Sequence, residues 1–197
     1  MRIIDDLKEK IKKAYPELSS IDDLVNTKLT YPELIQPLLE ALSYYAELDA
    51  GKLEFLIRAL TVKEAKAKAN KPLLDCVFSL AAQDKKKLDR VLWTVGNAFT
   101  IIIQPDDVIE IGKVLKTKEF GRGREMFALA LGKIRTPESE AILIDCLSDE
   151  DTAAHAISGL KAMKSQKALP YIQEKVLSSV FLEKREAQKY LKSYEKW

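Results

Sequence analysis

The chain has 197 residues, 47% of them hydrophobic, which suits one folded domain or one uninterrupted array of repeats. Its 32 basic and 30 acidic side chains give a net charge of +2 and are spread evenly over both halves of the chain. This balance argues against a nucleic-acid-binding protein, which normally shows a basic excess on one face. No apolar run is long enough to span a membrane, and the N-terminus lacks the apolar core of a signal peptide. We therefore expect a cytoplasmic protein that does not associate with membranes.

Catalytic and metal-binding signatures are missing from the sequence. The two cysteines, Cys76 and Cys146, each lie in an apolar helical run and are expected to be small buried hydrophobes in a reducing compartment. No Cys-x-x-Cys pair or histidine cluster accompanies them, so we expect no metal site. The Gly-Arg-Gly-Arg run at 121–124 lacks the Lys-Ser/Thr ending of a phosphate loop. We predict a protein that is not an enzyme and has no cofactor.

Apolar residues recur at helical spacing along the chain, and no alternating strand pattern interrupts them. Proline and serine mark several expected helix starts. Residues 62–70 are interpreted as a poorly buried helical turn plus linker, 100–103 as either helix or extended chain, and 120–123 as a flexible connection. The predicted helices span residues 3–15, 19–26, 31–45, 52–61, 72–82, 87–99, 105–116, 124–134, 138–147, 152–163, 167–178 and 182–196.

A repeated plan of helix, short polar turn and second helix runs from residue 124 to 172. Leu131 and Leu160 hold equivalent places, so the period is 29 residues, a length typical of helical solenoids. Val95 and Leu191 continue the series on either side. Small residues recur beside this position, as Gly96, Gly132 and Gly159. Glycine is unfavourable inside a helix, so its recurrence predicts close packing of one helix on the next.

The sequences W-T-V-G-N-A, G-R-G-R-E-M-F-A-L-A-L-G-K-I and H-A-I-S-G-L resemble those of small stand-alone bacterial HEAT-repeat proteins. This resemblance to the HEAT-repeat superfamily implies an all-α fold, a right-handed α-α superhelix of antiparallel helix pairs like that of HEAT and armadillo solenoids. It covers residues 52–197. We expect one solenoid domain over residues 1–197, in which the helices of residues 1–50 act as a cap.

The resemblance also implies a range of functions. HEAT arrays are usually rigid scaffolds that bind other macromolecules on their concave side. Some relatives bind DNA, one group with HEAT-like helices excises alkylated bases, and others handle tetrapyrrole attachment. The fold alone does not choose among these functions.

Five residues are candidates for contacting a partner: Trp93, Asn97, Arg122, Arg124 and His155. The arginines alternate with glycines where other repeats have a short polar turn, and arginine suits bidentate contact with carboxylates. The same residues can instead join adjacent repeats. Helix-end ion pairs are favoured for the arginines, and a core or semi-buried packing role for Trp93. Asn97 is expected to bond to the loop of the neighbouring repeat, and His155 to have a hydrogen-bonded place at the edge of a helix pair. In that case the docking surface is expected on the second helices of the repeats.

The predicted function is that of a non-enzymatic scaffold that binds another protein, as an adaptor or immunity-type protein, and acts as a monomer. Mixed charges on the second helices suit a protein partner better than a polyanion. The alternative is a HEAT-like protein that binds nucleic acid or excises alkylated bases. In that case Trp93 would stack on a base and a carboxylate such as Asp107 would act beside it. The balanced charge argues against this alternative.

Overall fold

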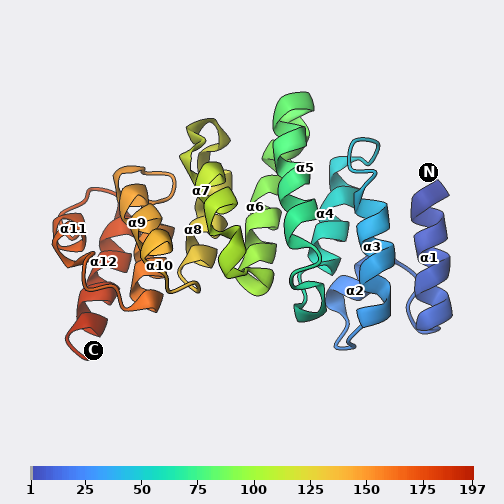
Figure 1. Cartoon of the computed structure of the whole chain (residues 1–197), viewed down its shortest axis with the longest axis horizontal. Coiled ribbons are helices and arrows are strands. Elements are labelled where there is room, and N and C mark those ends of the chain that lie inside the picture. The colour runs from blue at the N-terminus through green and yellow to red at the C-terminus, as the bar shows by residue number, and fades with distance from the viewer. Residues whose placement is uncertain (1) are drawn as a thin grey trace. The chain divides into compact units, whose positions relative to one another are not determined.

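The computed structural model describes residues 2–197, and Met1 lies outside the described residues. Over this range the chain forms twelve α-helices and five short 3-10 helices, with no β-strand (Figure 1). The prediction of an all-α fold of repeating helices is confirmed. The helices divide into two compact units, one ending at Ile102 and one spanning Ile103–Trp197. The single array over residues 1–197 and its cap stay predictions, and each unit is described by itself.

The first unit contains six α-helices in two layers. Helices α2, α4 and α6 contact one another in order, and α3 contacts both α1 and α4 (Figure 1). Ser20 begins α2 with a capping box, in which its hydroxyl accepts from the Asp23 N–H and the Asp23 carboxylate accepts from the Ser20 N–H. The elements are α1 (Arg2–Ala14), α2 (Ile21–Asn26), η1 (Pro32–Leu34), α3 (Ile35–Leu42), α4 (Ala50–Ala59), η2 (Lys63–Ala65), α5 (Asn70–Gln83) and α6 (Lys85–Ile102).

Asn70 connects residues 62–70, predicted to be a helical turn plus linker, with residues 100–103, predicted to be either helix or extended chain. The ambiguous residues Thr100–Ile103 continue α6 as far as Ile102. Asn70, which is only 4% exposed, donates from its side chain to the Ile102 carbonyl over 3.0 Å and accepts from the Ala67 N–H over 3.0 Å. It therefore joins the turn before α5 to the end of α6, so the predicted linker ends on a residue in the core.

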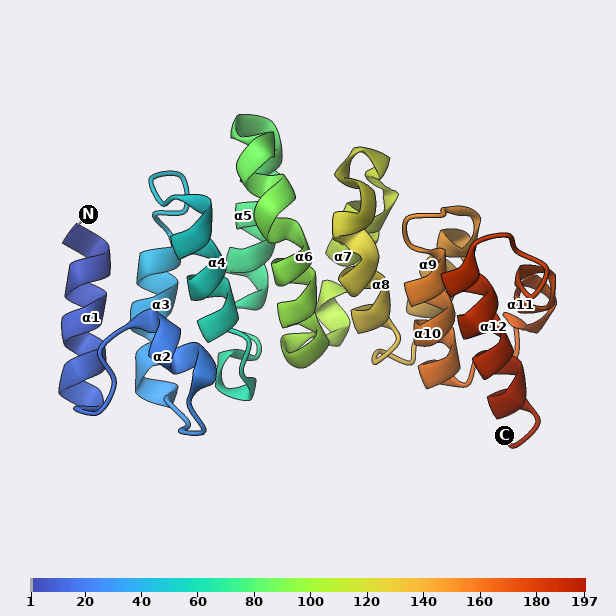
Figure 2. The same ribbon diagram turned by 180° about the vertical axis from the view of Figure 1, so that it is seen from behind.

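The second unit also has two layers. Helices α8, α10 and α12 contact one another in order, while α7, α9 and α11 pack beside them; Figure 2 shows α10 and α12 side by side. Helices α9 and α11 are the second helices of their repeats. The elements are η3 (Pro105–Asp107), α7 (Val108–Lys116), η4 (Lys118–Arg124), α8 (Glu125–Leu131), α9 (Pro137–Asp145), η5 (Cys146–Ser148), α10 (Ala153–Met163), α11 (Leu169–Lys175) and α12 (Phe181–Tyr194).

The repeat position seen in the sequence lies between α8 and α10. Leu131 and Leu160 are both fully buried. A Cβ atom placed on Gly132 would lie 2.4 Å from the Gly159 Cα, so the two helix backbones touch there. The predicted close packing of one helix on the next is confirmed for Gly132 and Gly159.

Among residues 2–197, no helix combines the length and the apolar character needed to cross a membrane.

Candidate interaction surface on the second helices

The five residues proposed from the sequence lie in two different units of the structure. Trp93 and Asn97 lie on α6 in the first unit, where Trp93 is 46% exposed and Asn97 is half-buried. Of the two places expected for Trp93, core or semi-buried, the core is wrong, because the buried face of α6 is formed by its neighbours. Arg122, Arg124 and His155 lie in the second unit. The structure therefore describes the two groups separately.

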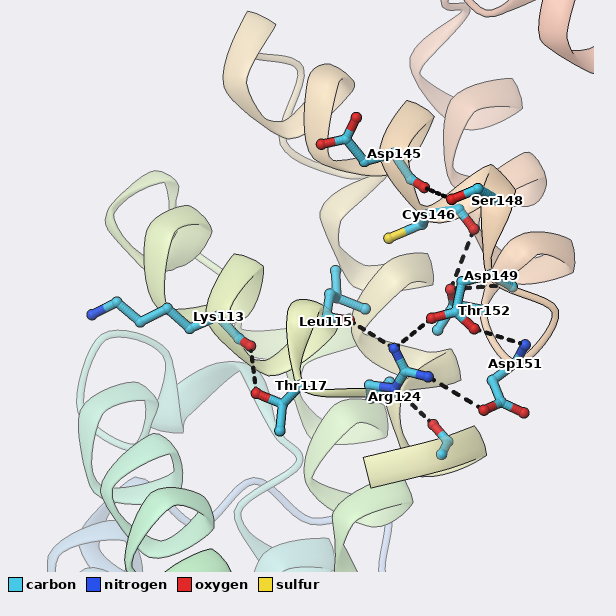
Figure 3. Close-up of polar contacts among 11 residues, drawn as sticks. Lys113, Leu115, Thr117, Arg124, Asp145, Cys146, Ser148, Asp149, Asp151 and Thr152 are labelled. Atoms are coloured by element: carbon cyan, nitrogen blue, oxygen red, sulfur yellow. Dashed lines mark hydrogen bonds and ion pairs between the residues drawn. The ribbon is translucent and has the colours of Figure 1, made fainter. Parts of the chain in front are cut away.

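Arg124 occupies the interior of the second unit and is 0% exposed (Figure 3). Its Nη1 donates to the Leu115 carbonyl and to Asp149 Oδ2, both over 2.7 Å. Its Nη2 pairs with Asp151 Oδ2 over 3.3 Å, and its Nε donates to the Gly121 carbonyl over 2.8 Å. One guanidinium thus joins the end of α7, the turn of η4 and the loop before α10. Because Arg124 is enclosed by these contacts, it is not available to a docking partner.

The connection before α8 is shaped by Gly121. Its φ of 52° and ψ of −144° lie where glycine is favoured over residues with a side chain. The Gly121 carbonyl accepts the Arg124 Nε–H in this conformation. Residues 120–123 were predicted to be a flexible connection, but they form part of a 3-10 helix with Phe120 buried. The conformation of Gly121 therefore places its carbonyl oxygen where the buried Arg124 can donate a hydrogen bond to it.

Asp149 remains ionised in this network. Partial burial would raise the pKa of its carboxyl group, but the hydrogen bond and the charge of Arg124 outweigh that effect and hold the pKa below its usual value. The Asp149 Oδ1 atom also accepts the Asp151 N–H over 3.1 Å. A buried arginine with its carboxylates in place is stable, whereas removal of either partner leaves an uncompensated charge.

Arg122 and His155 occupy surface positions with different surroundings. The Arg122 side chain is 72% exposed and donates from Nε to Glu125 Oε1 over 2.8 Å, as expected for a helix-end ion pair. His155 is half-buried on α10 and lines a hollow of about 190 Å³ with Ser158 and Glu186. Within residues 2–197, the His155 side chain has no hydrogen-bond or ion-pair partner from another residue. The hydrogen-bonded place at the edge of a helix pair stays a prediction for it.

The carboxylate suggested for the nucleic-acid alternative has a structural role. Asp107 is 8% exposed, and its Oδ2 accepts the Gln104 N–H over 2.7 Å at the start of α7. The side chain is part of a capping box of the 3-10 turn. An acid enclosed in a helix start is poorly placed to act on a flipped base.

Two hollows flank α9 on the side of the second helices. The pocket between α7 and α9, here the α7–α9 pocket, has a volume of about 160 Å³. Its lining residues are Leu115, Lys116, Lys118, Ile142, Asp145, Cys146, Ser148 and Asp149. The second hollow, here the α9–α11 groove, has a volume of about 560 Å³. Its lining residues are Ile144, Asp145, Leu147, Ser148, Tyr171, Glu174 and Lys175. Asp145 and Ser148 line both hollows, so the end of α9 and the η5 turn form a ridge between them.

The chemistry available in these hollows is limited. Burial raises the pKa of the Cys146 thiol to about 11 and that of Cys76 to about 12, so at neutral pH neither supplies the thiolate needed for nucleophilic attack. Over residues 2–197, no cluster of three or more His, Cys, Asp or Glu side chains is arranged to hold a metal ion.

Comparison with known families bears on the repeat that contains α8 and α9. Residues 124–149 match the family model of the PBS lyase HEAT-like repeat. This segment is similar to a HEAT-like repeat. The match begins at Arg124 and ends at Asp149, the two partners of the buried ion pair. The resemblance to the HEAT-repeat superfamily is confirmed, and HEAT-like repeats in general build scaffolds with extended binding surfaces. No curated protein and no solved structure matches the chain.

Proposed function

We propose that the protein is a non-enzymatic scaffold that binds another protein through the exposed side of α7, α9 and α11 in its second unit. The observation that carries this proposal is the pair of hollows on either side of α9. Both have apolar side chains in their lining, and charged side chains surround them. Interfaces between proteins combine an apolar centre with a polar rim in the same way.

Exposed apolar side chains on these helices support the same surface. Ile109 on α7 is 70% exposed, Tyr171 on α11 is 49% exposed, and Leu177 just after α11 is 87% exposed. None of the three belongs to the buried core. Tyrosine is also enriched among the residues that contribute most to protein interfaces. Tyr171 lines the α9–α11 groove, and Ile109 and Leu177 add exposed apolar area on α7 and just after α11.

The charges of this surface favour a protein over a nucleic acid. Lys116 and Lys118 line the α7–α9 pocket, whereas Asp145 and Glu174 line the α9–α11 groove. A phosphate backbone is attracted by a continuous run of basic side chains and repelled by carboxylates. Charges of both signs on one face instead fit a partner that presents complementary charges of both signs.

The residues proposed from the sequence give further positions to test, in each unit separately. Trp93, Asn97, Arg122 and His155 reach the surface and stay proposed contact residues. Arg124 is left out because its guanidinium is enclosed. The α9 surface is preferred because it combines hollows, exposed apolar side chains and both signs of charge within one unit.

Photo-crosslinking in cells tests which surface binds. A photoreactive phenylalanine derivative replaces Ser148, which is exposed between the two hollows, and in separate variants it replaces Trp93 or His155. Gln188 is the control, because it is exposed on α12 and lines neither hollow. We expect a discrete protein adduct from position 148 and none from position 188. Adducts from positions 93 or 155 alone would place docking on the first helices, and no protein adduct from any position would contradict the proposed function.

A further inference from the structure

The α9–α11 groove has an apolar floor and an acidic rim. Ile144 and Leu147 line it from α9 and η5, and Tyr171 adds a half-exposed aromatic ring from α11. Asp145 and Glu174 are exposed and contribute one carboxylate from each side of the groove. An apolar lining under charged groups suits a side chain that has a long apolar stem and a charged end.

The two carboxylates of the groove are not neutralised by the protein itself. In the part of the chain that the structure describes, neither Asp145 nor Glu174 forms an ion pair or a side-chain hydrogen bond. Figure 3 shows the Asp145 carboxylate pointing away from the Arg124 network, which takes up Asp149 and Asp151 instead. A partner can therefore meet both charges directly.

The lysine of the groove does not supply the missing positive charge, because it is engaged elsewhere. Lys175 Nζ lies 3.0 Å from Glu183 Oε2, which also accepts from Ser178 Oγ over 3.0 Å. Glu183 is 2% exposed, and a carboxylate so deeply buried needs a positive partner. Lys175 is thus held by Glu183, and the groove keeps a negative excess.

We infer that the α9–α11 groove binds an arginine side chain presented by the partner protein, an inference that rests on the proposed function. The arginine stem packs on Ile144 and Leu147, and its guanidinium meets the carboxylates of Asp145 and Glu174. The guanidinium also stacks on the ring of Tyr171, an interaction that arginine makes more often than lysine. The planar donors of arginine can serve two carboxylates at once, which the compact ammonium of lysine does less well.

The test uses small probes, because the partner protein is not needed to fill the groove. The full-length ¹⁵N-labelled protein is titrated with N-acetyl-arginine methylamide, with the lysine analogue, and with the citrulline analogue, which has nearly the shape of arginine but no charge. We expect the amide resonances of Leu147, Ser148 and Tyr171 to shift in a saturable manner with the arginine probe. The lysine probe should bind more weakly, and the citrulline probe should not bind detectably.

Matched variants assign the binding to the groove. The double variant Asp145→Asn with Glu174→Gln should weaken binding of the arginine probe about threefold to tenfold, the effect of losing two exposed ion pairs. Glu138→Gln removes one carboxylate charge from an exposed residue at the far end of α9 and should leave the affinity unchanged. Thermal melts of these variants confirm that they are folded.

The outcomes separate this inference from the proposed function. Equal binding of the citrulline and arginine probes, an unchanged affinity in the double variant, or shifts confined to other helices would overturn the arginine assignment. If Ser148 still crosslinks to a protein in that case, the proposed docking surface stands without the arginine. If the arginine probe binds as expected and Ser148 yields no protein adduct, the groove is confirmed and the docking function fails.

Discussion

The contact between α8 and α10 offers a sharp test of the packing, through the variant Gly132→Ala. The added Cβ atom would lie 2.4 Å from the Gly159 Cα and 2.7 Å from the Gly159 carbonyl oxygen. Carbon atoms in good contact lie about 3.5–4.0 Å apart. The atoms in the way belong to the backbone, so the two helices must separate by about 1 Å to make room.

The expected cost follows from this geometry. Overpacking a well-filled interior costs about 1–3 kcal/mol. Alanine is a better helix former than glycine by up to about 1 kcal/mol in a helix interior, but Gly132 is the C-cap residue of α8 and gains less. We therefore expect Gly132→Ala to reduce the free energy of unfolding by about 1–3 kcal/mol. For a protein of this length, that corresponds to a melting temperature lower by roughly 2–12 °C.

Two other glycines serve as matched controls. A Cβ atom on Gly159 would meet the Ala128 carbonyl oxygen at 3.0 Å and Leu143 Cδ1 at 3.1 Å, so Gly159→Ala should destabilise less than Gly132→Ala. A Cβ atom on Gly112 in α7 would meet only the side chain of Ile142, at 3.0 Å. Because that side chain can move, Gly112→Ala should be close to neutral or slightly stabilising.

Urea unfolding followed by circular dichroism measures this order. The slope of the transition should be checked in each variant, since a repeat protein can lose cooperativity when one interface is weakened. A Gly132→Ala variant as stable as the parent would refute the close contact of the α8 and α10 backbones. Equal losses in all three variants would show that the cost comes from the glycine backbone and not from helix packing.

Four further predictions concern the buried network, the core and the charge of the protein. Arg124→Met should cost about 3–5 kcal/mol in urea unfolding, because Asp149 then keeps a partly buried charge without its partner; Lys113→Met should change stability by less than about 1 kcal/mol, since both side chains of its ion pair with Glu110 are exposed, and equal costs would contradict the burial of Arg124. Leu131→Ala should cost about 2–5 kcal/mol as a fully buried truncation; a loss under about 0.5 kcal/mol, typical of surface positions, would mean that the core face is misplaced. The pKa of Asp149 is lowered in the folded state because Arg124 outweighs the effect of burial, so its contribution to stability is present above its unfolded pKa of about 3.9 and is lost as the pH falls through the lower folded value; Asp149→Asn should make acid unfolding less steep in this range, and an unchanged acid transition would argue against the ion pair. The net charge of +2 predicts no tight, salt-dependent binding to duplex DNA in fluorescence anisotropy, and sub-micromolar binding at physiological salt that weakens steeply as salt rises would support the nucleic-acid alternative.

The positions of the helices were determined largely by local sequence. Apolar spacing and capping residues predicted elements close to those observed, such as residues 105–116 for η3 and α7 and residues 182–196 for α12. The recurrence of Leu131 and Leu160 predicted the α8–α10 contact, because residues at equivalent places in stacked repeats meet equivalent neighbours. These features depend on residues a few places apart or on one repeat period, and both can be read along the chain.

The surface position of Trp93 was also available from the sequence, although the expectation of core packing missed it. Val91, Leu92 and Val95 are buried on α6, and the helical repeat of 3.6 residues places Trp93 away from the stripe that they form. Counting apolar neighbours along the chain favoured burial, whereas counting them around the helix would have favoured exposure.

Tertiary structure alone decided the role of Arg124 and the place of the α9–α11 groove. Arg124 and Asp149 lie far apart in sequence and meet because the loop before α10 folds back over the start of α8. An arginine is buried only where carboxylates and carbonyls from several elements surround it. The residues next to Arg124 in the sequence do not show which distant groups these will be. The groove likewise depends on how α11 packs beside α9. Asp145 and Glu174 acquire a shared environment there because two helices of successive repeats bring them to the same hollow.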